Sequence, residues 1–120
     1  MAVLFGVTMT FEENLRTFTG GSVASMALTL EGLGVDAMGV NCSLGPKELI
    51  PVVKEMRKYT KCPLIAKANA GLPDPLTNTY NVTPEEFAKD MELMAEAGAT
   101  IFGGCCGTTP EFIKALSLSI

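Results

Sequence analysis

Three of the four cysteines in this chain stand where they could bind one metal ion. Cys105 and Cys106 are adjacent in the segment GGCCGT, and Cys42 ends the related segment GVDAMGVNC. The chain contains no histidine, which excludes a Cys–His nucleophile pair, a Ser–His–Asp triad and any imidazole metal ligand within it. Three thiolates with a fourth coordination position left open suit zinc. The residue types therefore predict a zinc site of the catalytic kind.

The adjacent cysteines pose a geometric problem, because successive side chains on a regular strand point to opposite faces. Gly103, Gly104 and Gly107 flank the pair, and glycine permits a bend that turns both thiols to one side. The chain has no Cys-x2-Cys pair of the kind that structural zinc sites use. Two other interpretations stay open: small buried apolar side chains, or a strained vicinal disulfide between Cys105 and Cys106.

Two further polar residues near the predicted strands are assigned different roles. Cys62 precedes Pro63 at the start of a predicted strand, at the opposite end from the other cysteines, and we expect it to be structural. Asn69 ends the predicted strand that lies between the cysteine-bearing strands. Its amide oxygen is a candidate transient metal ligand or substrate contact, and its alternative role is to form a turn before Gly71. The loop at 72–82 is either a plain surface loop or a lid over the site.

The elements that must position these residues alternate regularly along the chain. Near-continuous apolar runs predict strands, and Ser, Thr and Pro at helix-start positions predict helices. We predict strands at 2–11, 34–42, 63–71 and 99–107, and helices at 22–33, 46–59, 83–97 and from 109 to the C-terminus. Pro51 lies inside the second helix and is expected to bend it or delay its start. Strands that are apolar throughout favour a parallel sheet covered by helices, an α/β fold.

An internal repeat indicates the type of sheet. The segment at 34–46 aligns without gaps to the segment at 98–110, and this alignment pairs Cys42 with Cys106. The period is two βα units, which suits a (β/α)8 TIM barrel, where alternate strands share layers of side chains. Four units are half of such a barrel. We therefore expect residues 1–120 to form one half-barrel (βα)4 unit, with the three cysteines at the carboxyl ends of its strands, where barrel sites are built.

A half barrel leaves one face of its sheet without helices. We expect that face to be apolar and to carry Val40, either Ala66 or Ile65, and either Phe102 or Ile101, depending on the register. Its first and last strands would also expose unpaired backbone groups. The chain is therefore expected to pair with a second copy of itself or with the N-terminal half of a barrel.

Composition excludes several classes of protein. The 120 residues are 48% hydrophobic and 18% charged, which is enough to bury a core and unlike a disordered chain. No run of eighteen apolar residues predicts a membrane span. The net charge is −4 and the nine basic residues are scattered, which argues against nucleic acid as a partner. The first residues do not resemble a signal peptide, so we expect a cytoplasmic protein rather than a disulfide scaffold.

The segments GVNCSLGP, KANAGLP and GGCCGTTPEFI, in this order and spacing, resemble the homocysteine S-methyltransferase family. The likeness runs across the whole chain and is greatest to the homocysteine-binding module of the cobalamin-dependent methionine synthases. The resemblance implies a (β/α)8 barrel, of which this chain corresponds to the C-terminal half, as a fragment or a split subunit. It also implies that Cys42, Cys105 and Cys106 are zinc ligands. Ala68 departs from the family, which often has proline before Asn-Ala-Gly.

The resemblance implies zinc-dependent methyl transfer to the thiol of homocysteine, giving methionine. The implied partners are homocysteine, the other half of the barrel or a second copy, and a cobalamin-bearing domain that supplies methylcobalamin. Without histidine the chain cannot contain the D-x-H-x-x-G cobalamin motif itself. We expect the isolated chain to be inactive. The alternatives are a non-catalytic zinc-binding half barrel and a redox protein that uses the vicinal cysteines.

Overall fold

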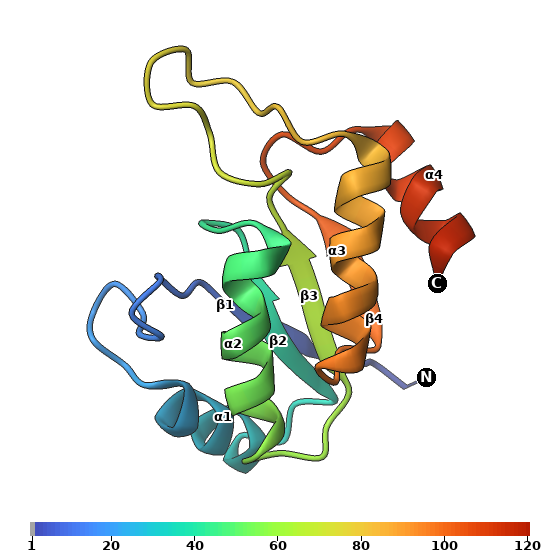
Figure 1. Cartoon of the computed structure of the whole chain (residues 1–120). Helices are drawn as coiled ribbons and strands as arrows, with labels where there is room; N and C mark the ends of the chain where they lie inside the picture. Colours follow the sequence, from blue (N-terminus) through green and yellow to red (C-terminus); the bar gives the residue numbers. More distant parts are fainter. Residues whose placement is uncertain (1) are drawn as a thin grey trace.

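The computed structural model describes residues 2–120, which form four βα units in sequence (Figure 1). The elements are β1 (Gly6–Met9), α1 (Val23–Gly32), β2 (Ala37–Asn41), α2 (Pro46–Arg57), β3 (Leu64–Ala68), α3 (Pro84–Glu96), β4 (Ile101–Gly104) and α4 (Pro110–Ser119). All neighbouring strands pair in parallel, in the order β1-β2-β3-β4. The predicted α/β fold of four consecutive βα units is confirmed.

The helices begin at the positions that the capping residues in the sequence indicate. The Ser22 hydroxyl accepts a hydrogen bond from the Ser25 amide at the start of α1. Thr83 and Glu86 cap α3 reciprocally, because each side chain accepts a hydrogen bond from the backbone amide of the other. Helix α2 starts at Pro46 and continues through Pro51. The expectation that Pro51 delays the start of this helix is therefore wrong; the proline removes only one donor from the helix interior.

The strands are shorter than the apolar runs suggested. The third predicted strand at 63–71 shrinks to Leu64–Ala68, and the other three shorten in the same way. The cause lies in the residues that follow β2, β3 and β4, which leave the extended conformation. Cys42, Ser43, Gly71 and Gly107 all have positive φ, so the chain turns at these points although its composition stays apolar.

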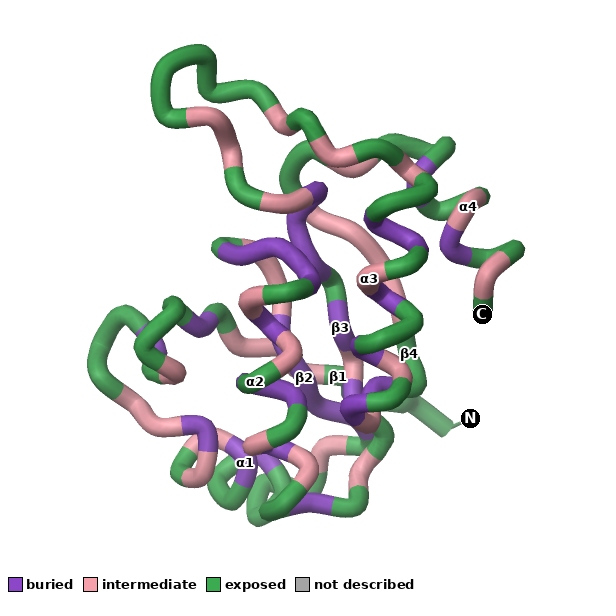
Figure 2. Tube along the Cα trace, viewed as in Figure 1, coloured by how far each residue is buried: buried purple, intermediate pink, exposed green. Residues whose placement is uncertain are grey.

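The helices cover one face of the sheet, and the core lies between them (Figures 1 and 2). Buried side chains from β2 and β3 meet buried side chains from α2 and α3, and Phe11, which follows β1, joins the same core. The largest fully buried side chains are Phe11, Met38, Val40, Leu49, Val52, Val53, Met56, Leu64, Phe87, Met91 and Met94. Phe87 also contacts Phe112 of α4 edge to face, with ring centroids 5.5 Å apart. Within residues 2–120, no helix has the length and apolar character needed to cross a membrane.

The register shows which residues occupy the other face of the sheet. Val40, Ala66 and Phe102 are register partners and pack into the core on the helix side. Since strand side chains alternate between faces, the open face carries Thr8, Gly39, Asn41, Ile65, Lys67, Ile101 and Gly103. The expectation of an apolar open face that includes Val40 is wrong. The face is mixed: Ile65 and Ile101 are neighbours on β3 and β4, and the other residues are small or polar.

Candidate metal centre

Three thiols converge at the carboxyl ends of the strands. The sulfur atoms of Cys42, Cys105 and Cys106 all lie within 4.8 Å of one another, and Cys42 Sγ is 3.6 Å from Cys106 Sγ. Cys42 follows β2 and the adjacent pair follows β4, with β3 between them. All four cysteines of the chain are free. The parallel order of the strands brings Cys42 and Cys106 together although they are 64 positions apart in the sequence.

A left-handed turn directs Cys42 toward the cluster. Its backbone amide still donates to Lys67 O at 2.9 Å, as in a continued β2–β3 ladder. Cys42 and Ser43 then take φ values of 57° and 65°, which L-residues rarely adopt and which cost on the order of 1 kcal/mol each. The Leu44 amide closes the turn on Cys42 O at 2.7 Å. Such a strained backbone conformation persists only where the surrounding structure holds it. Here the strained turn directs the Cys42 thiol toward Cys105 and Cys106.

A tight turn solves the problem of the adjacent cysteines. The Thr108 amide donates to Cys105 O at 3.1 Å, and the third residue of this turn, Gly107, has φ 79°, as a type II turn requires. Gly107 therefore provides the predicted bend. Gly103 and Gly104 lie within β4 instead, and a Cβ at Gly104 would stand 2.4 Å from the Thr108 hydroxyl.

Asn69 holds the two cysteine-bearing segments in place. Its side chain is only 3% exposed, and Oδ1 accepts a hydrogen bond from the Cys106 amide at 3.0 Å. Its own amide donates to Leu44 O at 3.0 Å, beyond the Cys42 turn. Asn69 thus contacts the loops that follow both β2 and β4. In this arrangement the amide oxygen positions Cys106.

Replacing Asn69 by alanine should lower the zinc affinity of the chain about 10- to 100-fold, as loss of an outer-shell partner of a ligand does. The reason is that the Cys106 amide would lose its buried acceptor and the turn would loosen. Competition titration against a zinc chelator measures the change. Asn14→Ala is the matched control, because Asn14 Oδ1 also accepts one backbone hydrogen bond, from Arg16, far from the cluster. Equal zinc affinities for both variants would contradict the positioning role.

The thiols differ in how readily they ionise without a metal. A hydrogen bond from the Cys105 thiol lowers the pKa of Cys42, and the Ser43 amide acts in the same direction. Burial raises the pKa of Cys105 to about 11. Cys42 therefore loses its proton before Cys105 as the pH rises, and Cys105 keeps its proton above neutral pH. A metal that binds all three sulfurs must displace the Cys105 proton, so its affinity should increase as the pH rises.

The geometry fits a tetrahedral zinc ion. With Zn–S bonds of about 2.3 Å, ligand sulfurs are separated by about 3.8 Å. The separation of 3.6 Å between Cys42 and Cys106, and the limit of 4.8 Å for all three sulfurs, agree with that spacing. Cys42 and Cys105 are half-buried, whereas Cys106 is exposed. The cluster therefore offers three sulfur donors and is open to an incoming ligand on one side.

Two other residues complete the comparison with the sequence-based assignments. Cys62 is half-buried at the amino-terminal side of β3, where it packs against the core, and it does not belong to the cluster.

Tyr80, in the loop after β3, was not predicted. Its ring lies against the backbone of Gly107, next to Cys106, and partial burial and the neighbouring Cys106 sulfur raise the pKa of its hydroxyl. The only sequence signal for it is that the loop at 72–82 has no other aromatic residue.

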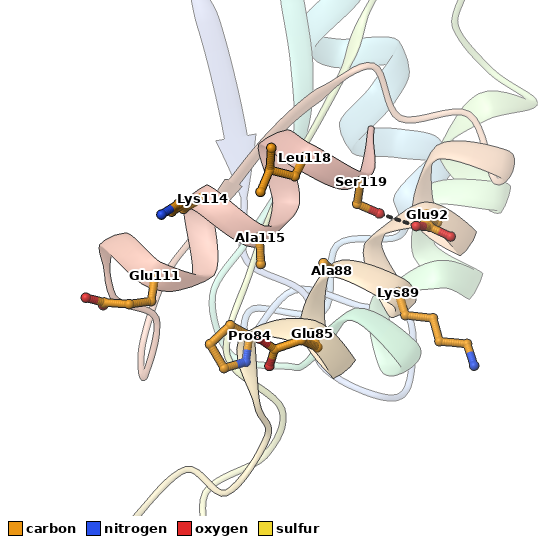
Figure 3. A pocket seen from close by; sticks show the side chains of 10 residues that line it. All are labelled: Pro84, Glu85, Ala88, Lys89, Glu92, Glu111, Lys114, Ala115, Leu118 and Ser119. Carbon is orange, nitrogen blue, oxygen red and sulfur yellow. Dashed lines mark hydrogen bonds between the residues drawn. The ribbon is translucent and has the colours of Figure 1, made fainter.

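A groove also lies elsewhere in the described chain, between α3 and α4 (Figure 3). Its volume is about 810 Å³, and Lys89, Glu92, Glu111 and Lys114 surround an apolar floor. Charges of both signs alternate around its rim, and it contains no thiol. The groove therefore offers no converging set of groups for chemistry, and the cysteine cluster remains the candidate site.

Comparison with known proteins identifies the family. The family model described as homocysteine S-methyltransferase matches residues 2–120. The chain belongs to the homocysteine S-methyltransferase family. Within this family, the methionine synthase of Mycobacterium leprae is 32% identical over 95% of this chain and 10% of that protein. The methionine synthase of Mycobacterium tuberculosis is 36% identical over 90% of this chain and 9% of that protein.

Solved structures give the same fold. The homocysteine methyltransferase MmuM from Escherichia coli, in its metallated form, superposes with a TM-score of 0.77 at 24% identity, covering 97% of this chain and 35% of MmuM. Its apo form gives 0.75 at 23% identity, over 98% of this chain and 40% of that one. The chain thus spans about a tenth of the methionine synthases and about a third of MmuM. Its four βα units match one part of a barrel of this family.

Proposed function

We propose that this chain is the zinc-carrying, homocysteine-binding part of a homocysteine S-methyltransferase. The observation that carries the proposal is the cluster of three free thiols within 4.8 Å of one another, open on one side, in a member of this family. Cys42, Cys105 and Cys106 would hold the metal. The product would be methionine, formed by methylation of the homocysteine sulfur.

The chemistry that the reaction needs is a thiolate at neutral pH. A free thiol has a pKa near 8.5 and is mostly protonated there, so it attacks a methyl group slowly. Zinc, when bound, supplies the positive charge that keeps the substrate sulfur deprotonated. The three cysteines would supply negative charge around it, which keeps the substrate sulfur a good nucleophile.

The residues of this chain would prepare the site rather than transfer protons. The left-handed turn at Cys42 and the turn at Gly107 aim the thiols toward one point. Asn69 fixes the Cys106 backbone. The exposed side at Cys106 leaves room for a small thiol to approach. None of these roles requires a histidine or a carboxylate, and the cluster contains neither.

The methyl donor and the rest of the barrel would come from other domains or chains. We propose methylcobalamin, carried by a separate cobalamin-bearing domain, because two relatives that the chain matches over at least 90% of its length are methionine synthases. The open sheet face and the unpaired edges of β1 and β4 would be covered by the N-terminal half of the barrel. The isolated chain would then bind zinc but not complete a methyl transfer.

Addition of millimolar homocysteine to the zinc-loaded chain at neutral pH should release about one proton per site, because the thiol binds as a thiolate. A pH indicator in weak buffer measures the release. Homoserine, which has a hydroxyl in place of the thiol, and the metal-free chain are the controls. Zinc binding without proton release would favour a non-catalytic zinc module. A chain that takes up no zinc and reversibly oxidises Cys105 and Cys106 would favour a redox protein.

A further inference from the structure

Lys67 places a positive charge on the open face of the sheet, next to the cysteine cluster. It lies near the carboxyl end of β3, the strand between the two that lead to the cysteines. Its backbone carbonyl accepts a hydrogen bond from the Cys42 amide at 2.9 Å, and the carbonyl of Ala68 accepts one from the Cys105 amide at 2.9 Å. This stretch of β3 therefore holds Lys67 and both cysteine-bearing segments in fixed relative positions.

A glycine on β4 leaves room for the lysine side chain. Gly103 is the register partner of Lys67, and a Cβ on Gly103 would stand 3.1 Å from Lys67 Cγ and 3.6 Å from Lys67 Cδ. The aliphatic stem of the lysine therefore lies over the backbone of β4, just before that strand reaches Cys105. The stem occupies the space that a side chain of β4 would otherwise fill.

The neighbours of Lys67 along the open face favour an ammonium group that faces the cluster. On the side away from the cysteines, the next row of open-face residues is apolar and consists of Gly39, Ile65 and Ile101. A lysine covers apolar surface with its stem and keeps its charged end away from it. On the other side of Lys67 are the three thiols, none of which is fully buried. The charged end therefore has a polar neighbourhood only in the direction of the cluster.

Lys67 has no carboxylate partner within residues 2–120. The ion pairs of this part of the chain join Lys47 to Asp90 and Lys58 to Glu55. In a complete barrel of this family the open face would line the interior. A charged group that is removed from water needs a partner of opposite charge. We therefore expect an anion beside Lys67 when the site is complete.

On the basis of the proposed function, we propose that Lys67 binds the carboxylate of homocysteine and so selects thiols that carry a negative charge. Strands lie about 4.8 Å apart and rise about 3.3 Å per residue, so the Cα atoms of Cys42 and Lys67 are separated by about 6 Å. Homocysteine has only a short carbon chain between its sulfur and its carboxylate. The flexible four-carbon stem of a lysine can therefore reach that carboxylate while the substrate sulfur is at the cluster.

Two thiols of the same length test the proposal on the zinc-loaded full chain. 4-Mercaptobutanoate keeps the carboxylate of homocysteine and lacks its amino group, whereas 3-aminopropane-1-thiol keeps the amino group and lacks the carboxylate. Calorimetric titration measures the dissociation constant of each thiol, for the wild type and for Lys67→Met, which removes the charge and keeps an unbranched side chain. The zinc content of each protein is measured before and after the titration.

The ratio of the two dissociation constants should favour 4-mercaptobutanoate about fivefold more in the wild type than in Lys67→Met, as one solvent-exposed ion pair provides. The ratio is the right quantity, because loss of a positive charge beside thiolates weakens the zinc–sulfur contact of both thiols alike. Lys67→Arg should keep most of the preference. Lys61→Met is the matched control, because Lys61 is also exposed but lies before the amino-terminal end of β3.

Salt provides a second test that needs no variant. The preference of the wild type for 4-mercaptobutanoate should decrease as the ionic strength rises, because salt screens an exposed pair of charges. A preference that does not change with salt would contradict binding by an ammonium group.

The outcomes separate this proposal from the proposed function. A ratio that falls in Lys67→Met and not in Lys61→Met supports the carboxylate site. Equal ratios in the wild type and Lys67→Met overturn it and leave the metal centre standing; the partner of Lys67 would then be a carboxylate from the N-terminal half of the barrel. A wild-type chain that takes up no zinc, or that binds neither thiol, overturns both.

Discussion

Alanine in place of Cys105 or Cys106 should lower the zinc affinity of this chain by roughly a hundredfold to a thousandfold. The binding free energy of zinc in a four-ligand protein site is about 10–16 kcal/mol. Loss of one thiolate ligand therefore removes a large share of that free energy. The two remaining sulfurs could not replace it, because no other cysteine, histidine or carboxylate of residues 2–120 belongs to the cluster. Competition with a chelator of known affinity measures the loss.

Cys62→Ala is the matched control for these variants. Cys62 is also a half-buried free cysteine, but its sulfur faces Val35 O, 3.9 Å away, at the other end of the sheet. Zinc affinity should be unchanged in this variant. If Cys105→Ala kept the affinity of the wild type, or if Cys62→Ala lost it, the three-cysteine centre would be wrong.

The isolated chain should associate at micromolar concentration instead of remaining a monomer of 12.7 kDa. Parallel sheets occur almost only with both faces covered, and here the helices cover one. The backbone groups of β1 and β4 are unpaired along their outer edges, and such edges pair readily with other chains. Light scattering measures the mass, and circular dichroism shows whether the associated chain is folded.

A pair of variants tests whether the chain associates through the open face of the sheet or through another surface. Ile101 lies on the open face and is 44% exposed, while Leu93 lies on α3 and is 45% exposed. Ile101→Lys should weaken association by placing a charge in the interface, and Leu93→Lys should not. A folded wild-type monomer at these concentrations would contradict the account of an incomplete barrel, as would equal effects of the two variants.

Much of the fold follows from local patterns that needed no tertiary information. Thr83 and Glu86 form the capping box that their spacing predicts, and Pro46 begins α2. The parallel order of the strands follows because each strand is joined to the next by a helix. Once that order is known, the carboxyl ends of β2 and β4 must lie at one edge of the sheet. This is why the meeting of Cys42 with Cys105 and Cys106 could be predicted.

What the sequence could not predict depends on register and on turns. Val40 and Asn41 are adjacent, and only the observed pairing decides which of them faces the helices. The left-handed conformation of Cys42 and Ser43 has no signal in composition, because neither residue is glycine or asparagine. The Tyr80 ring lies against Gly107 because of the path of the eleven-residue loop at 72–82, and loop paths are set by contacts at their ends. The position of Asn69 between the cysteine-bearing strands marked it as a site residue. Its hydrogen bond with the Cys106 amide could not be predicted from the sequence.

X-ray absorption at the zinc edge of the loaded chain, with and without homocysteine, tests the central claim most directly. The proposed centre predicts three sulfur neighbours at about 2.3 Å, as in zinc–thiolate sites, and four after homocysteine is added. Homoserine should leave the count at three. Fewer than three sulfurs in the wild type would contradict the assignment of Cys42, Cys105 and Cys106, and a count that homocysteine does not change would contradict the binding of its thiol at this centre.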